Sequence, residues 1–410
     1  MKIAVLGGGI AGLAAAWRLR EHEVTVFEAR ERPGGNIRTE RFEDCLVEWG
    51  PNGFLDNEPA TLRLIDELGL GARVRRAREA AAVRYVYRAG RLRALPPSPP
   101  RFLLSGCLPL LARLRVLLEP FAKGPPDGDE AVVDVAAARP GRGAASVLVD
   151  AFVTGVYAGD PKRLSVASAF PKLKALEAEY GSLIRGAKGR GFGPKGVLTG
   201  FDGGLQVLVD ELAGRVDLRL GEGWEVLEPG GYDRVVCTVP APRAAALAPP
   251  DLAAALREIP TAPVAVVALV FDEPLDVPDA FGFLAPRGQG LRILGALYDS
   301  SIFDGRAPPG RRLVRGMVGG RRDPEALHLD DGELVEAVAR DLRAAWGAWK
   351  EPRAGKIVRH PLGIAQYEIG HGARLERIGA VCPPWLRLAG SSYRGVSLNA
   401  CIKEALEWTP

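Results

Sequence analysis

Residues 2–13, Lys-Ile-Ala-Val-Leu-Gly-Gly-Gly-Ile-Ala-Gly-Leu, decide the fold of this 410-residue chain. Their apolar opening predicts a short strand that is buried on both faces of a parallel sheet. The pattern Gly-x-Gly-x-x-Gly follows at once, and the alanine- and leucine-rich residues after it predict a helix. A second predicted strand over residues 24–27 ends at Glu28. Strand, glycine loop, helix, strand and acid, in this order, indicate a dinucleotide-binding unit.

Each part of this unit has a physical role. Gly7 permits the tight turn out of the strand, Gly9 lets a pyrophosphate approach the backbone, and Gly12 lets the helix pack closely on the strand. The helix N-terminus offers free N–H groups and a partial positive charge to the phosphates. Glu28 lies 21 residues after Gly7, where a carboxylate accepts hydrogen bonds from ribose hydroxyls, whereas the glycines alone would also fit a plain loop. The predicted contacts are Gly7, Gly8, Gly9, Ile10, Ala11, Gly12, Leu13 and Glu28.

A second glycine element, residues 31–39 (Glu-Arg-Pro-Gly-Gly-Asn-Ile-Arg-Thr), follows the acid and favours FAD over NAD. A Gly-Gly pair between arginines combines close backbone approach with cationic donors, which suits a second contact with the diphosphate. A simple turn between strands is the alternative. The element resembles the Arg-x-Gly-Gly-x-x-x-Thr/Ser motif of the flavin amine oxidase and desaturase superfamily. It adds Arg32, Gly34, Gly35 and Asn36 to the predicted cofactor contacts.

Composition excludes several classes of protein. The 54 basic and 50 acidic residues leave a formal net charge of +4, which gives no reason to expect nucleic acid as a partner. Four histidines without metal-ligand spacing predict no metal site. Five cysteines without a Cys-x-x-Cys pair predict a reducing compartment and no disulfide framework. The chain opens on a strand rather than a signal peptide, and its longest apolar run, residues 264–271, is far shorter than the ~20 residues of a spanning helix, so we expect a cytoplasmic protein.

The rest of the chain predicts an α/β plus α+β protein. Period-2 and apolar stretches predict strands over residues 84–88 and 260–320, and helical periodicity predicts helices over residues 59–70 and 330–349. We expect a discontinuous Rossmann-type FAD-binding domain with two further parts. The boundaries are 1–78, 196–242 and 376–410 for the FAD-binding domain, 79–92 and 243–375 for a substrate-binding domain with an antiparallel sheet, and 93–195 for a helical, membrane-associating insertion.

Residues 110–121 carry an apolar stripe at helical spacing. Its members are Leu110, Leu111, Leu114, Leu117, Leu118 and Phe121. One interpretation is a face that packs on the core. The other is a face that lies in a membrane interface, with Arg101, Arg113 and Arg115 near lipid headgroups. On the second interpretation, residues 100–122 make peripheral contact with the inner face of the cell membrane.

Several segments outside the glycine loops carry a more specific pattern. They include Gly-Val-Tyr-Ala-Gly-Asp at 155–160, Phe-Gly-Phe-Leu at 281–284, Pro-Leu-Gly-Ile-Ala-Gln-Tyr at 361–367 and Tyr-Arg-Gly-Val-Ser-Leu-Asn-Ala-Cys-Ile at 393–402. Together they resemble the oxygen-dependent protoporphyrinogen/coproporphyrinogen oxidase family of haem biosynthesis, nearly end to end. The first and last segments are far more specific than the glycine loop.

The resemblance implies the remaining contacts with FAD. These are Gly50, Pro51, Asn52, Gly53, Ser391, Val396, Ser397 and Leu398. The last group precedes a predicted helix, whose N-terminal N–H groups would face the N1–C2=O edge of the flavin and stabilise its anionic reduced form. The chain departs from the family between residues 216 and 233, where the resemblance leads us to expect that a strand that usually contacts the adenine is missing, so the sequence assigns no residue there.

The resemblance also implies a substrate site. Its residues are Arg84, Gly155, Ala158, Phe281, Gly282, Leu284 and Met317. Arg84 is the implied anchor for a propionate, because a guanidinium fork matches a carboxylate. Without the resemblance, Arg84 would be a solvated surface charge, and Phe281, Leu284 and Met317 would be core residues.

The implied reaction is hydride transfer from a methylene bridge of a porphyrinogen to flavin N5, followed by reoxidation with oxygen and release of hydrogen peroxide. Protoporphyrinogen IX is the favoured substrate and coproporphyrinogen the close alternative. No catalytic acid or base is expected in these motifs. Two other interpretations stay open: another flavin oxidase or desaturase, acting on amines or carotenoids, and a non-catalytic escort protein on the same fold. The sequence also leaves a homodimer open.

Overall fold

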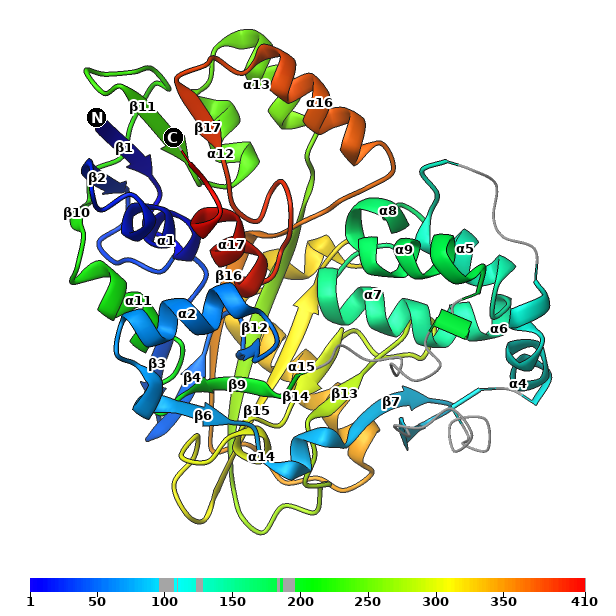
Figure 1. Cartoon of the computed structure of the whole chain (residues 1–410). Helices are drawn as coiled ribbons and strands as arrows, with labels where there is room; N and C mark the ends of the chain where they lie inside the picture. The colour runs from blue at the N-terminus through cyan, green and yellow to red at the C-terminus, as the bar shows by residue number, and fades with distance from the viewer. Residues whose placement is uncertain (96–106, 109, 123–127, 183–184, 187–195, 410) are drawn as a thin grey trace.

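The protein has a mixed α/β fold of two large sheets and a separate group of helices (Figure 1). The structure is a computed structural model that describes the chain except residues 96–106, 109, 123–127, 183–184, 187–195 and 410. Both chain ends lie beside the first sheet, so the fold starts and finishes in the same unit.

The first sheet is parallel throughout and has the order β10-β2-β1-β11-β17. Its strands are β1 (Lys2–Leu6), β2 (Glu23–Glu28), β10 (Asp217–Leu220), β11 (Arg234–Cys237) and β17 (Leu386–Leu388). The residues of β1 after Lys2 are buried, which confirms the predicted strand. Because side chains alternate along a strand, Ile3 and Val5 enter one core and Ala4 and Leu6 enter another.

Helices cover both faces of this sheet. One core contains residues of α1 (Ile10–Arg18), α2 (Pro59–Glu67), α11 (Gln206–Ala213) and α17 (Leu398–Leu406). The opposite core contains residues of α12 (Ala241–Leu247), α13 (Pro250–Arg257) and α16 (His371–Val381). A parallel sheet between two helical layers is the Rossmann-type arrangement that the opening sequence predicts.

The second sheet has seven strands in the order β16-β12-β15-β14-β13-β7-β8. They are β7 (Arg84–Arg88), β8 (Arg91–Ala94), β12 (Thr261–Asp272), β13 (Gly282–Leu284), β14 (Gly295–Leu297), β15 (Arg311–Gly319) and β16 (Ala354–Ala365). Every neighbouring pair is antiparallel except β13–β7, which is parallel. The predicted antiparallel sheet is wrong at that pair, because the β7–β8 hairpin comes from a distant part of the chain and no hairpin turn fixes its direction.

The two faces of the second sheet pack on different partners. Helix α15 (Asp331–Trp346), which starts with a capping box between Asp330 and Glu333, covers one face. The hairpin of β3 (Thr39–Phe42) and β4 (Cys45–Glu48) packs on the other. Three short strands, β5 (Phe54–Leu55), β6 (Val74–Arg76) and β9 (Leu198–Phe201), form a further small sheet. α14 (Asp299–Ile302) precedes β15.

The remaining helices form a group beside the second sheet (Figure 1). They are α4 (Leu110–Leu117), α5 (Val132–Ala138), α6 (Arg142–Ala144), α7 (Asp150–Tyr157), α8 (Val166–Ala169) and α9 (Pro171–Tyr180), with a π-helical turn over Ala145–Val149. Among the described residues, no helix combines the length and the apolarity that crossing a bilayer requires. The domain boundaries stated above stay a prediction.

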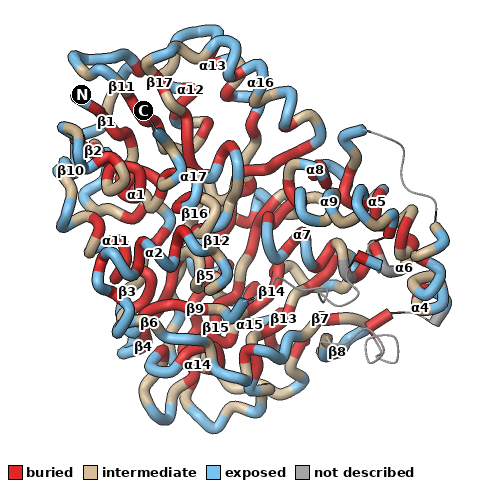
Figure 2. The backbone as a smooth tube through the Cα atoms, viewed as in Figure 1, coloured by how far each residue is buried: buried red, intermediate tan, exposed pale blue. Residues whose placement is uncertain are grey.

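The apolar stripe of α4 faces outward (Figure 2). Ala112 is buried and faces Gly143 of α6, whereas Leu111 and Phe121 are each 80% exposed. The core-facing interpretation of this stripe is therefore wrong, because the opposite side of α4 makes the packing contact. Arg113 and Arg115 donate to the carbonyl oxygens of Leu108 and Ala138 at 2.9 Å each. Residues 100–106, with Arg101, lie outside the described part of the chain.

Candidate active site

The glycine loop joins β1 to α1 in a conformation that needs glycine. Gly7 has φ +105°, in the left-handed region that side chains avoid. A Cβ on Gly12 would lie 1.9 Å from the carbonyl oxygen of Gly7, so α1 packs against the loop only because Gly12 has none. Gly9, at the helix start, has ordinary extended dihedrals (φ −75°, ψ 173°). The backbone conformation at position 9 therefore does not require glycine.

The second glycine element docks directly onto the first. The Gly34 N–H donates to the Gly8 carbonyl oxygen at 2.7 Å, and Gly9 and Gly34 form an isolated parallel bridge. A Cβ on Gly9 would have Gly35 Cα, at 3.8 Å, as its nearest neighbour. The two loops therefore face each other through glycines, and the first turn of α1 opens beside them. This arrangement fits a diphosphate in contact with both loops.

Glu28 is held where the ribose contact is expected. Its carboxylate accepts from the Gly8 N–H at 2.8 Å and from the Arg30 N–H at 3.0 Å. The side chain is buried, and a carboxylate has about four acceptor directions, so two are left for hydroxyl groups. The glycine loop and the acid thus fix each other.

Arg32 shapes the second loop from within. Its guanidinium donates to the carbonyl oxygens of Gly35 at 2.9 Å, Ile37 at 3.0 Å and Pro33 at 3.1 Å. Burial, together with the nearby Arg30 and Arg38, lowers the pKa of Arg32. Because several of its donors are used by the loop, Arg32 presents the Gly-Gly backbone as well as adding positive charge.

The predicted flavin loop at residues 50–53 follows β4 and touches the second glycine element. A Cβ on Gly50 would lie 1.9 Å from the Asn36 carbonyl oxygen, so only glycine fits. Before it, the Trp49 carbonyl oxygen lies 2.6 Å from His360 Nε2. Burial and the Arg30, Arg32 and Arg38 charges lower the pKa of His360, which favours the neutral ring at neutral pH.

Buried ion pairs anchor the same loop, and sequence reasoning missed them. Arg315 pairs with Asp299 at 2.6 Å and donates to the Asn52 side-chain oxygen at 2.7 Å and to the Glu48 carbonyl oxygen. Glu48 pairs with Arg306 at 3.1 Å; burial raises the pKa of Glu48, against the attraction of Arg306. A charge inside an apolar strand, such as Arg315 in Leu-Val-Arg-Gly-Met-Val, is the signal that could have found this network. The Asn52 side-chain nitrogen is buried without a protein partner among the described residues.

The C-terminal segment carries the remaining predicted cofactor contacts. After β17 the chain turns at Gly390 and reaches α17, whose N-cap Ser397 accepts from the Ala400 N–H at 3.2 Å. Val396 packs against the cluster that contains Tyr367, and Leu398 belongs to the core that α1, α2 and α17 share. Helix α17 packs along α1, so two helix N-termini belong to one unit.

The structure brings the predicted substrate residues together on one wall. Gly282 pairs with Arg84 across β13 and β7, and the Arg84 guanidinium lies 4.8 Å from the centre of the Phe281 ring. A Cβ on Gly155 of α7 would meet Leu284 at 3.0 Å. The remaining two residues, Ala158 and Met317, pack together with Leu294. Phe281, Leu284 and Met317 are partly buried and pack against apolar core clusters.

Arg84 is an exposed cation at the start of β7, beside this wall. It makes no ion pair with an acid among the described residues, and burial lowers its pKa. Arg88 and Arg93, the neighbouring cations of the β7–β8 hairpin, donate instead to backbone oxygens of Cys107 and Arg88. Arg84 is thus available for an anionic group from outside the chain.

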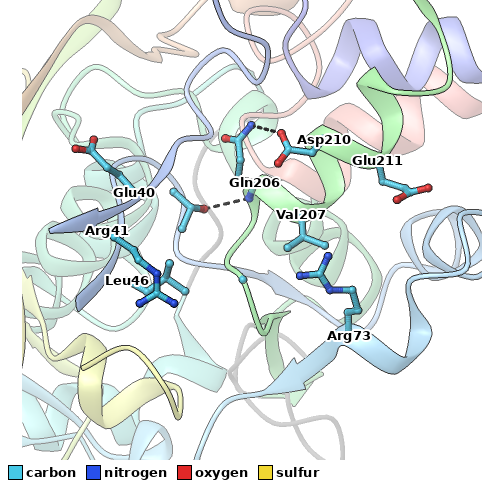
Figure 3. Close-up of a pocket in the computed structure, with 10 residues that line it drawn as sticks. Glu40, Arg41, Leu46, Arg73, Gln206, Val207, Asp210 and Glu211 are labelled. Carbon is cyan, nitrogen blue, oxygen red and sulfur yellow. Dashed lines mark hydrogen bonds between the residues drawn. The ribbon is translucent and has the colours of Figure 1, made fainter. Parts of the chain in front are cut away.

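A pocket of 460 Å³ lies elsewhere, between β3 and the start of α11 (Figure 3). None of the predicted site residues lines it. Gln206 hydrogen-bonds Asp210, one turn further along α11, at 2.8 Å, and Thr39 accepts from the Gln206 N–H at 3.0 Å. Of the polar residues that line it, Thr39, Gln206 and Asp210 are linked by these two bonds.

The fold and this site together define a class of protein. A doubly covered parallel sheet, two glycine loops in contact, a buried acid at the end of β2 and a second helix packed along α1 fit a flavin-dependent oxidoreductase. The residues predicted to contact a substrate come from the second sheet and its edge and from the end of α7.

Comparison with known proteins places the chain within that class. It is 34% identical to protoporphyrinogen oxidase of Bos taurus and 32% identical to coproporphyrinogen III oxidase of Mycobacterium leprae (strain TN), each over 98% of this chain and 96% of the relative. A presumed protoporphyrinogen oxidase from Exiguobacterium sp. 255-15 matches with a TM-score of 0.87 and 25% identity, over 99% of this chain and 97% of that one. The chain belongs to the family of flavin-containing amine oxidoreductases, whose model matches residues 10–406, and within it to the porphyrinogen oxidases. The family predicted from the motifs is confirmed, and the cofactor is FAD.

Proposed function

We propose that the protein oxidises a porphyrinogen to the porphyrin in haem biosynthesis, with oxygen as the acceptor and hydrogen peroxide as product. The observation that carries the proposal is the substrate wall: one cation without an acidic partner, Arg84, above an aromatic ring, beside small and apolar residues. A macrocycle with carboxylate side chains needs both features. Protoporphyrinogen IX is the favoured substrate and coproporphyrinogen the close alternative.

The chain's own residues would orient the substrate and would not transfer protons. Arg84 would hold a propionate, Phe281 and Met317 would contact the ring, and Gly155 and Gly282 would leave room for it. Gly7–Leu13, Glu28, Gly34–Asn36 and the segments 50–53 and 391–398 would hold FAD. The bound cofactor would accept the hydride. Apart from Arg84, the seven wall residues have no titratable side chain, so no acid or base is assigned.

A direct assay tests the proposal. Protoporphyrinogen IX and coproporphyrinogen III, reduced anaerobically, are each mixed with the purified flavoprotein and aerated. We expect porphyrin fluorescence to rise above a boiled-enzyme control, with faster turnover of protoporphyrinogen and about three peroxides per porphyrin, one per two-electron oxidation. A yellow protein that leaves both substrates unoxidised, but yields peroxide with amines, would overturn the proposal. A protein without bound flavin would favour the escort interpretation.

We also propose that α4 rests on a membrane surface. Leu111, Leu114, Leu117, Leu118 and Phe121 are each more than half exposed and lie on one side of the segment. An apolar helix face of this kind enters the interface between headgroups and acyl chains. The guanidinium groups of Arg113 and Arg115 bond to carbonyl oxygens of the chain, so the apolar side chains supply most of the attraction.

Changing Leu111, Leu114 and Phe121 together to serine is expected to weaken co-sedimentation with phosphatidylcholine–phosphatidylglycerol vesicles at least about tenfold, because each buried apolar side chain contributes about 1.5–3 kcal/mol. Turnover of soluble substrate should stay the same. Val226→Ser is the control, since Val226 is 56% exposed but far from α4 in sequence and fold. Equal vesicle binding by the triple variant and the parent would refute the membrane contact.

A further inference from the structure

The segment Gly363–Tyr367, here named the seam, joins the end of β16 to both halves of the site. This segment lies within the Pro-Leu-Gly-Ile-Ala-Gln-Tyr stretch, to whose residues the family resemblance assigns no contact. On the cofactor side, the Asn36 side-chain nitrogen donates to the Gly363 carbonyl oxygen at 3.2 Å. On the substrate side, Ile364 packs with Ala158 and Met317. The next two residues, Gln366 and Tyr367, bond to the last residue of α7 and to the loop before α17; Figure 1 shows these elements.

Tyr367 bridges the segment that leads into α17. Its hydroxyl donates to the Ser391 carbonyl oxygen at 2.8 Å and accepts from the Gly395 N–H at 2.7 Å. Gly395 in turn touches α17, because a Cβ there would lie 2.3 Å from Ala400 Cβ. One hydroxyl therefore fixes both ends of the loop that carries Ser391 and precedes Val396.

The ring of Tyr367 is itself held rigidly. It is buried, it stacks on His371 at 4.2 Å with an interplanar angle of 17°, and it meets Tyr157 edge-on at 5.9 Å. His371 Nε2 lies 2.9 Å from the Tyr393 carbonyl oxygen in the same loop. Burial raises the pKa of the Tyr367 hydroxyl, so it keeps the proton that it donates to Ser391.

Gln366 holds the end of α7 on the substrate side, as Tyr367 holds the loop before α17. Its side-chain nitrogen donates to the Tyr157 carbonyl oxygen at 2.8 Å, one residue before Ala158. Ala158 ends α7 with φ +48°, a conformation that costs a non-glycine residue free energy and needs support from its surroundings. The Gln366 bond, together with the Arg321 N–H that donates to Ala158 O at 2.8 Å, supplies that support.

We propose that Gln366 and Tyr367 are positioning residues that set the substrate wall and the flavin against each other. The proposal rests on the proposed function for its substrate. Adjacent residues reach opposite partners: Gln366 holds the end of α7, and Tyr367 holds the loop into α17. A hydride donor and its acceptor must lie about 3–3.5 Å apart, so a small shift between these partners slows transfer.

Two variants separate the two roles. Tyr367→Phe keeps the ring and removes both hydroxyl bonds, which leaves the Gly395 N–H and the Ser391 carbonyl without that partner. We expect kcat for the porphyrinogen to fall about tenfold, with KM within about twofold and a shifted visible flavin spectrum. Gln366→Met removes the bond to Tyr157, and we expect KM to rise about tenfold while the flavin spectrum stays the same.

Tyr393→Phe is the matched control. The backbone of Tyr393 belongs to the same loop, but its ring lies in the core with α12, α13 and α16, and its buried hydroxyl has no protein partner among the described residues. If Tyr367→Phe behaves like Tyr393→Phe in kcat and spectrum, the proposal for Tyr367 is wrong. If Gln366→Met leaves KM unchanged, the proposal for Gln366 is wrong. Should the parent protein oxidise no porphyrinogen, the proposed function fails, while the flavin spectra of the two tyrosine variants still test the cofactor side.

Discussion

A Gly9→Ala variant is expected to fold normally and to bind FAD at least about a hundredfold more weakly. The added methyl group meets nothing closer than Gly35 Cα at 3.8 Å, and the backbone at Gly9 suits any residue. The methyl group does, however, fill the space between the glycine loops, where we expect the diphosphate. Losing two charge-assisted hydrogen bonds of about 1.5–3 kcal/mol each accounts for an effect of that size.

The measurement is bound flavin per protein, followed by titration of the apoprotein with FAD. Gly379→Ala is the control, because a Cβ there meets nothing within 4 Å on α16, far from the loops. Gly12→Ala makes the contrast: its Cβ would lie 1.9 Å from Gly7 O, so we expect loss of stability as well as of flavin. Full flavin occupancy in Gly9→Ala would contradict the placement of the diphosphate.

Arg84→Ala is expected to raise KM for the porphyrinogen about ten- to a hundredfold and to leave bound FAD unchanged. The reason is the loss of a charge-assisted bond to a propionate, worth about 1.5–3 kcal/mol, from a residue whose backbone pairs only within the substrate sheet. Steady-state kinetics with each porphyrinogen, together with the flavin spectrum, measure both quantities.

Arg84→Lys should fall between the parent and the alanine variant, because an ammonium keeps the charge but lacks the two-pronged donor geometry. Arg91→Ala is the control, since Arg91 is an exposed cation of the same hairpin, on β8. Loss of flavin from Arg84→Ala would contradict the assignment of Arg84 to the substrate. An equal rise in KM for Arg91→Ala would point to a general effect of surface charge.

The cofactor side was readable from the sequence because its signals are local. The conformation of Gly7 and the close packing of Gly12 depend on neighbours a few residues away, and Glu28 follows at a fixed spacing. The structure adds one relation that no spacing reveals: the Gly34 N–H bonds the Gly8 carbonyl oxygen, so two separate motifs form one surface.

The supports of the site were not readable in the same way. Asn52 is oriented by Arg315, and Trp49 by His360, across more than 250 and 300 residues of chain. The parallel pairing of β13 with β7 also joins distant parts of the chain, and it brings Arg84 beside Gly282 and Phe281. No turn or helical period encodes such contacts, because they arise when distant strands join one sheet.

By itself the sequence determined the dinucleotide unit, the choice of FAD and the family, because glycine spacing and strand–helix order are local consequences of backbone geometry. Only the tertiary structure decided that the stripe of α4 faces outward, that Arg84 has no acidic partner among the described residues, and that Gln366 and Tyr367 join the two halves of the site. These features depend on which surfaces remain after distant segments have packed, and burial and pairing are properties of the whole fold.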